Sequence, residues 1–97
     1  TPEAIINVVC DYFKVDYKDI VGKKKNKEIV EPRMIAVYLI SELLNLPLVN
    51  IGKIFGGRDH TTIMHSRDKI TEEVKNNKKT ANIVNEIRQT LSASWFL

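Results

Sequence analysis

The sequence contains a single cysteine, Cys10, so an internal disulfide is impossible and a reducing, cytoplasmic setting is favoured. No apolar run approaches the ~20 residues of a transmembrane helix, and no secretory signal pattern opens the chain. We therefore expect no membrane insertion. No segment alternates apolar and polar residues as strands do, which leaves an all-α fold. The first residue is Thr1 rather than Met, which is typical of a fragment or a processed chain.

What the sequence does contain is typical of a compact globular protein. Its 97 residues are 43% apolar and 28% charged, which predicts one domain spanning residues 1–97. The formal net charge of +3 suits a polyanionic partner. This charge collects in two segments, residues 22–33 with a net charge of +3 and residues 51–70 with a net charge of +2. An anionic partner should meet both segments.

Apolar residues recur at helical spacing along most of the chain. The pattern predicts about six helices, over residues 2–14, 17–21, 32–45, 48–54, 59–75 and 79–92. Thr1 is placed to cap the first helix and Asp16 the second. The third is apolar almost all round, so we expect it to be buried and central. Residues 22–31 form a basic loop, and the terminal residues 92–97 either fold back through Trp95 and Phe96 or fray.

Cys10 lies among Ile6, Val9 and Phe13 in the first predicted helix. These apolar neighbours favour a buried structural thiol over a reactive one.

The densest stretch is "FGGRDHTT", residues 55–62, between the fourth and fifth helices. A short helix, a glycine turn and a longer helix form the helix-turn-helix pattern, although any two helices of a bundle can be joined this way. If Ile63 faces the core, Ile70 and Val74 share its side, and the opposite face is polar. Residues of that opposite face are Thr61, His65, Asp68 and Glu72. A face that is short and polar at its start and acidic further on suits a helix whose first turns enter the DNA major groove.

The residues at the start of this helix fit base recognition. Asp59 can accept a hydrogen bond from a cytosine amino group, and the Thr61 methyl can pack on a thymine methyl. Asp59 can equally be the N-cap of the helix, and both roles stay open. If Arg58 and His60 do not contact DNA, Arg58 is a solvated charge in the loop and His60 is an ordinary exposed residue of the first helical turn.

The pattern does not favour an enzyme. His60 and His65 are five residues apart, about 140° around a helix, which is not the spacing of a helical zinc pair, so we expect no metal. The side chains of Asp59 and His60 are expected to diverge, with no nucleophile beside them to activate. No Gly-Lys-Ser/Thr follows the glycines, so no ATP site of the P-loop type is predicted. The main alternative to DNA binding is a helical adaptor whose basic loop docks an acidic protein.

Two stretches, "IGKIFGGRDHTTIMHSRDKI" and "KKKNKEIVEPRMIAVYLISELLN", closely resemble the C-terminal DNA-binding domain of DnaA, the bacterial chromosomal replication initiator. The resemblance implies a TrpR-like helical fold that binds DnaA boxes in double-stranded DNA, A/T-rich motifs resembling 5′-TTATNCACA. It also implies a bacterial cytoplasmic, nucleoid-associated protein. The AAA+ domain that holds ATP in the family is absent here, so the fragment is expected to be monomeric, without a cofactor and without enzymatic activity.

The resemblance also assigns residues to the DNA. Asp59, His60 and Thr61 match positions that touch bases in the major groove. Thr62 and His65 match phosphate-binding positions, and Leu48 and Val49 match backbone positions that approach phosphate. Lys25 matches a minor-groove position where the family commonly has arginine, and Lys24 or Lys27 could take that role instead. Arg33, Arg58 and Lys69 complete the predicted DNA-binding set.

Overall fold

The computed structural model describes the backbone of residues 1–95 and the side chains of residues 1–93. Over these residues the chain forms six helices and no strand, which confirms the all-α prediction. They are α1 (Pro2–Phe13), α2 (Tyr17–Ile20), α3 (Lys27–Leu44), α4 (Leu48–Ile54), α5 (His60–Asn76) and α6 (Lys78–Trp95).

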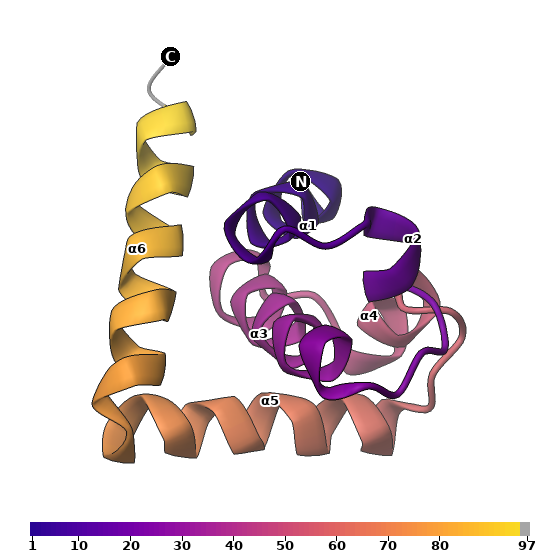
Figure 1. Ribbon diagram of the computed structural model, residues 1–97. Coiled ribbons are helices and arrows are strands. Elements are labelled where there is room, and N and C mark those ends of the chain that lie inside the picture. The colour runs from indigo at the N-terminus through magenta and orange to yellow at the C-terminus, as the bar shows by residue number, and fades with distance from the viewer. Residues whose placement is uncertain (96–97) are drawn as a thin grey trace.

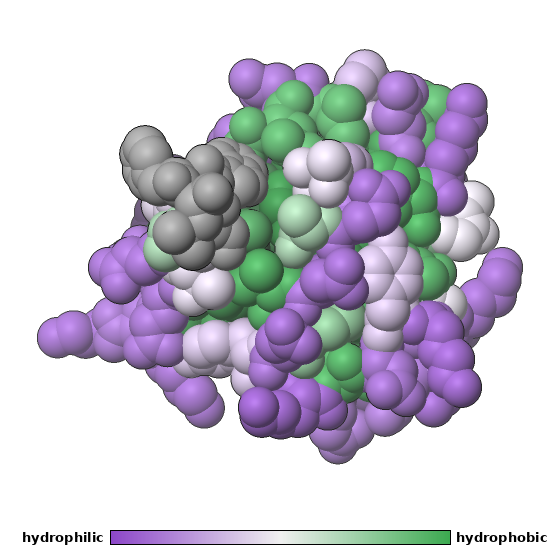
Figure 2. Space-filling view, turned by 90° about the horizontal axis from the view of Figure 1, so that it is seen from above, coloured by the Kyte–Doolittle hydropathy of each residue, from purple (hydrophilic) through white to green (hydrophobic). Residues whose placement is uncertain are grey.

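Helix α3 lies at the centre of the fold and contacts α1, α2, α4 and α5 (Figure 1). Helix α5 crosses beneath it, and α6 turns away from the end of α5 and packs against α1, which it crosses. Seen from above, hydrophobic side chains lie across the middle of the molecule and hydrophilic ones project around its edge (Figure 2). None of the helices in residues 1–95 combines the length and apolarity needed to cross a membrane.

Helix α1 begins and ends as its sequence predicts. The Thr1 hydroxyl accepts a hydrogen bond from the Ala4 amide at 3.2 Å, which satisfies a free N–H of the first turn. At the other end, Lys14 adopts the left-handed conformation with φ 59°. Asp16 occupies the N-cap position of α2, but its side chain makes no capping hydrogen bond.

Cys10 is buried in the core with 7% exposure, as predicted. Burial, followed by the charges of Asp11 and Asp16, raises the pKa of its thiol above the ordinary value. We expect it to react with a thiol reagent at pH 7 at least about tenfold more slowly than in urea-unfolded chain, because the core must open first. A colorimetric thiol assay on folded and unfolded protein measures both rates. Equal rates would show that the thiol is accessible.

Helix α3 begins at Lys27, five residues before the Pro32 start predicted from the sequence. A proline often opens a helix, but here it lies in the second turn, where it lacks an N–H for the Glu28 carbonyl. Burial of Ile29 and Pro32 offsets that loss by fixing the first turn against the core. The basic loop is therefore shorter than residues 22–31, and Lys27 lies on the helix.

Helix α6 is longer than the predicted 79–92 and buries Val84, Ile87 and Leu91. It continues through Trp95, so the backbone of residues 92–95 is helical and does not fray. The predicted contact through the Trp95 side chain lies outside the described side chains. The predictions for Phe96 and Leu97 lie outside the described residues.

Candidate nucleic-acid interface

Helices α4 and α5 are joined by a tight turn that is built on glycines. Gly56 and Gly57 have φ of 75° and 78°, a conformation that side chains disfavour. The Gly52 carbonyl accepts hydrogen bonds from the Gly57 and Arg58 amides at 3.0 and 2.9 Å. A Cβ added at Gly52 would collide with the Arg58 carbonyl oxygen. The turn therefore closes directly onto the α4 backbone, and this contact fixes the direction in which α5 leaves.

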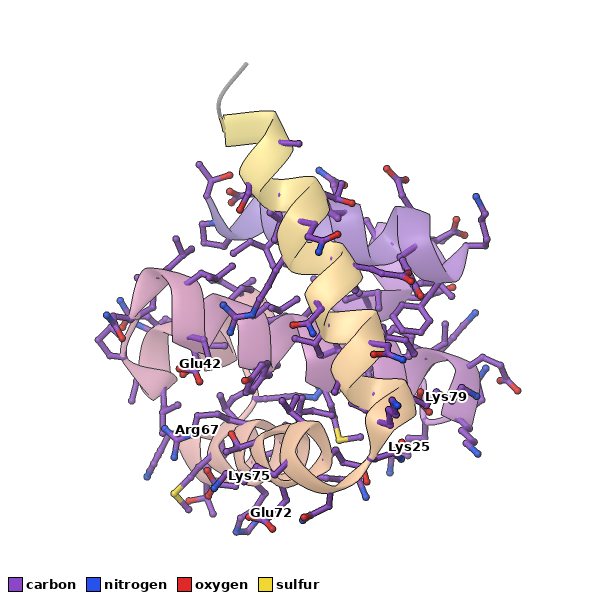
Figure 3. All side chains as sticks on the ribbon, turned by 90° about the vertical axis from the view of Figure 1, so that its left-hand side faces the viewer. Lys25, Glu42, Arg67, Glu72, Lys75 and Lys79 are labelled. Carbon is purple, nitrogen blue, oxygen red and sulfur yellow. The ribbon has the colours of Figure 1, made fainter. Side chains whose placement is uncertain are left out.

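The orientation predicted for α5 is confirmed. Ile63 and Ile70 are 1% and 2% exposed, and Val74 is partly buried against the same core. Thr61, His65, Asp68 and Glu72 are all exposed on the other side. Glu72 and Lys75 point away from the rest of the molecule at the far end of α5 (Figure 3). Helix α5 thus presents one outward face that is polar at its start and acidic near its end.

Asp59 is the N-cap of α5. Its Oδ2 accepts a hydrogen bond from the Thr61 amide at 3.0 Å, and this bond lowers the pKa of the carboxyl group. The expectation that Asp59 and His60 diverge is wrong, because His60 Nδ1 lies 3.5 Å from Asp59 Oδ1. The extended N-cap backbone, with φ −62° and ψ 146°, turns the Asp59 side chain back over the first helical turn. The cap role is confirmed, and base recognition stays a prediction.

The residues predicted to contact DNA at the start of α5 are all exposed and form what we call the tip of α5. They are Asp59, His60, Thr61, Thr62 and His65. Lys69 is exposed further along the helix.

At the start of α4, the two predicted residues differ in exposure. Val49 is 54% exposed, whereas Leu48 is only partly exposed and packs against the core. Leu48 can therefore approach a ligand through its backbone but not through a free side chain.

The lysines around the basic loop are exposed, but not all are free. Lys24 Nζ lies 3.2 Å from Asp19 Oδ2. Lys25 and Lys27 line a groove of about 600 Å³ that also involves Lys69 of α5 and Lys79 of α6. Lys25 and Lys79 lie at the end of the molecule where α6 begins (Figure 3). The groove therefore joins the basic loop to the middle of α5.

Arg33 is buried at 7% exposure, an unexpected position for a predicted DNA contact. Its guanidinium donates to the backbone carbonyls of Ile20, Lys24 and Asp19 at 2.6, 2.8 and 2.8 Å. Burial, followed by the charge of Arg58, lowers the pKa of Arg33. Three of its five N–H donors are thus already used inside the protein, and the direct DNA contact stays a prediction that this buried position does not favour.

Arg58 is half-buried and is not the solvated loop charge that the sequence allowed. It donates to the carbonyls of Phe55 and Gly22, both at 2.7 Å. Sequence reasoning missed this bond to Gly22 and the close contact at Gly52. The contact at Gly52 could have been inferred from the sequence, because a glycine inside a predicted helix often marks close backbone packing.

Within the described part of the chain, no three side chains of His, Cys, Asp or Glu gather as metal ligands would.

Comparisons with known proteins agree with this geometry. Residues 2–70 match the family model described as the bacterial dnaA protein helix-turn-helix. The chain is 46% identical over 79 residues to the chromosomal replication initiator protein DnaA of Thermomicrobium roseum, covering 81% of this chain and 17% of that protein. For the protein of the same name from Roseiflexus castenholzii, identity is 40% over 94 residues, covering 97% and 20%. The chain thus spans a fifth or less of these relatives.

A solved structure described as that of a DNA replication initiation factor has a similar fold. It superposes with a TM-score of 0.81 at 30% identity, over 92% of this chain and 27% of the other.

Proposed function

The chain belongs to the bacterial DnaA helix-turn-helix family, and from this we propose that it binds double-stranded DNA at DnaA boxes, in the initiation and regulation of chromosomal replication. One observation carries the proposal. The start of α5 is exposed and polar on one face, while the opposite face of the helix is buried in the core through Ile63 and Ile70. A helix held in this way can enter a major groove without losing its own packing.

Bases are recognised by the first turn of α5. Thr61 offers a methyl group for thymine and a hydroxyl group for a base or a phosphate. One oxygen of Asp59 is used by the cap, and its second oxygen, beside His60, can accept from a cytosine amino group. Cap and base contact are therefore compatible, because they use different oxygens.

Phosphates are held on either side of that turn. Thr62 and His65 are exposed on α5 and can donate to phosphate oxygens. Leu48 and Val49 lie in the first turn of α4, where backbone N–H groups and the helix dipole favour an anion such as phosphate. Lys69 adds charge further along α5.

The basic loop contacts the minor groove or its phosphates. Lys24 is already paired with Asp19, so Lys25 and Lys27 are the freer lysines for this contact. Lysine is a more strongly hydrated minor-groove ligand than arginine, so its contribution should be mainly electrostatic and sensitive to salt. We further propose that the chain acts as a monomer in the bacterial cytoplasm, at the nucleoid, and that ATP binds in another domain of the whole protein.

Fluorescence anisotropy with two labelled duplexes tests the proposal. At near-physiological salt, a duplex containing TTATCCACA should bind at least about tenfold more tightly than a duplex of the same bases in scrambled order. Equal affinity for both would contradict sequence-specific binding. The absence of binding to either duplex would favour the adaptor alternative.

A further inference from the structure

The backbone between α2 and α3 is held by two arginines from different parts of the chain. Arg33 reaches it from α3 and bonds the carbonyls of Asp19, Ile20 and Lys24. Arg58 reaches it from the turn before α5 and bonds the Gly22 carbonyl, 36 residues earlier in the sequence. Four carbonyls within residues 19–24 are thereby fixed by guanidinium groups, which are strong, directional donors.

Arg58 joins two structures that the proposed function assigns to different grooves. Its Nη1 donates to Phe55 in the turn before α5, and its Nη2 donates to Gly22 at the start of the basic loop. Gly56 brings the same two segments together, because a Cβ added there would lie 2.9 Å from the Val21 carbonyl oxygen. The loop backbone therefore rests on the turn that aims α5.

The arrangement is not explained by charge pairing. All five hydrogen bonds of the two guanidinium groups go to backbone carbonyls. The pKa of Arg33 is lowered by burial and then by the charge of Arg58, and the smaller, opposite effect of the Asp19 charge does not reverse this. The forked guanidinium group of arginine can donate to two separate carbonyls at once, which the single ammonium group of lysine does not do.

We propose that Arg58 is a positioning residue that holds the basic loop at a fixed place relative to the start of α5, so that both grooves can be met at once. The proposal rests on the proposed function. An ordered loop avoids the entropy cost of ordering on binding, so Arg58 raises specific affinity without touching the DNA. Arg33 anchors the same backbone from α3.

The substitution Arg58→Lys separates positioning from charge. Lysine keeps the positive charge but cannot bridge the Phe55 and Gly22 carbonyls. We expect affinity for the DnaA-box duplex to fall about tenfold. Affinity for the scrambled duplex should stay within about twofold of wild type, because a non-specific complex does not require both grooves to be met at once. The salt dependence should also be unchanged, because lysine keeps the charge. Arg88→Lys on α6 is the matched control and should change neither affinity.

A double-mutant cycle shows whether Arg58 acts through the loop. A triple variant with Lys23→Ala, Lys25→Ala and Lys27→Ala removes three exposed lysines in and beside the loop and keeps only Lys24, which is paired with Asp19. In this background, adding Arg58→Lys should cost less than about twofold, because the loop no longer binds. An undiminished tenfold cost would overturn the proposal. So would an Arg58→Gln variant that loses affinity equally for both duplexes with a shallower salt slope, since that is the behaviour of a direct phosphate contact.

Hydrogen exchange tests the clamp without DNA. Amides of residues 21–26 should exchange faster in Arg58→Lys, while those of α3 and α5 keep their wild-type protection. Unchanged exchange in the loop, or global unfolding of both Arg58 variants, would overturn the positioning role. If wild-type protein fails to prefer the DnaA box but the loop amides still respond, the proposed function fails and the clamp stands.

Discussion

Replacing Gly52 by alanine is expected to destabilise the protein by at least about 3 kcal/mol, because the new methyl group has no space. Its Cβ would collide with the Arg58 carbonyl oxygen, which is backbone and cannot rotate away as a side chain would. A shift of that backbone would also strain the hydrogen bonds that the Gly52 carbonyl accepts from Gly57 and Arg58. The helix propensity gained by alanine, about 1 kcal/mol, is too small to compensate.

Gly57→Ala is the matched control for this substitution. Gly57 also belongs to the turn, but a Cβ there would have nothing within 4 Å, so only its φ of 78° is unfavourable. We expect a loss of about 1–2 kcal/mol for this variant. Urea unfolding followed by circular dichroism compares the two. If Gly52→Ala proved as stable as Gly57→Ala, or more stable, this result would contradict the close contact between Gly52 of α4 and the Arg58 carbonyl oxygen.

Features that depend on neighbouring residues were predictable from the sequence. The spacing of Ile63 and Ile70 indicated the buried side of α5, and both are buried. Thr1 indicated the start of α1, where its hydroxyl accepts the capping hydrogen bond from the Ala4 amide. Each of these signals acts within a helical turn or two, so residue type and spacing are enough to read it.

Features that depend on distant partners were not predictable. The roles of Arg33 and Arg58 are set by carbonyls 9 to 14 and 36 residues away, and a backbone carbonyl leaves no mark in the sequence. The start of α3 depended on how Ile29 packs, which outweighed the preference of Pro32 for a first turn. Even the nearby Asp59–His60 approach depended on the N-cap backbone conformation and not on sequence spacing.

Replacing Thr61 by alanine is expected to weaken binding to the DnaA-box duplex by about 1–3 kcal/mol, while affinity for the scrambled duplex changes little. Thr61 donates to Asp59 through its backbone amide, so alanine retains the donor of the N-cap hydrogen bond and loses only the weaker contribution of the Thr61 hydroxyl. Stability should therefore stay within about 0.5 kcal/mol of wild type, as is usual for an exposed position. Anisotropy titrations with both duplexes, beside urea unfolding, measure the two effects. An equal loss on both duplexes would contradict base recognition by Thr61.

Asp59 needs two substitutions, because it combines the cap with the proposed base contact. Asp59→Ala removes both, so we expect lower stability together with about tenfold weaker binding to the DnaA box. Asp59→Asn keeps a capping oxygen but places an amide donor where the proposed contact needs an acceptor. It should fold nearly as well as wild type and still bind the DnaA box weakly.

The pH dependence of unfolding separates the cap from the contact. The folded-state pKa of Asp59 is lowered, mainly by the Thr61 amide, so the stability it contributes is present above the ordinary carboxyl pKa. That contribution is lost as pH falls through the lowered folded-state pKa, and Asp59→Asn should not show this loss. If Asp59→Asn binds the DnaA box as tightly as wild type and only Asp59→Ala is impaired, Asp59 serves the helix alone. Recognition of bases by the start of α5 then depends on Thr61 and its exposed neighbours.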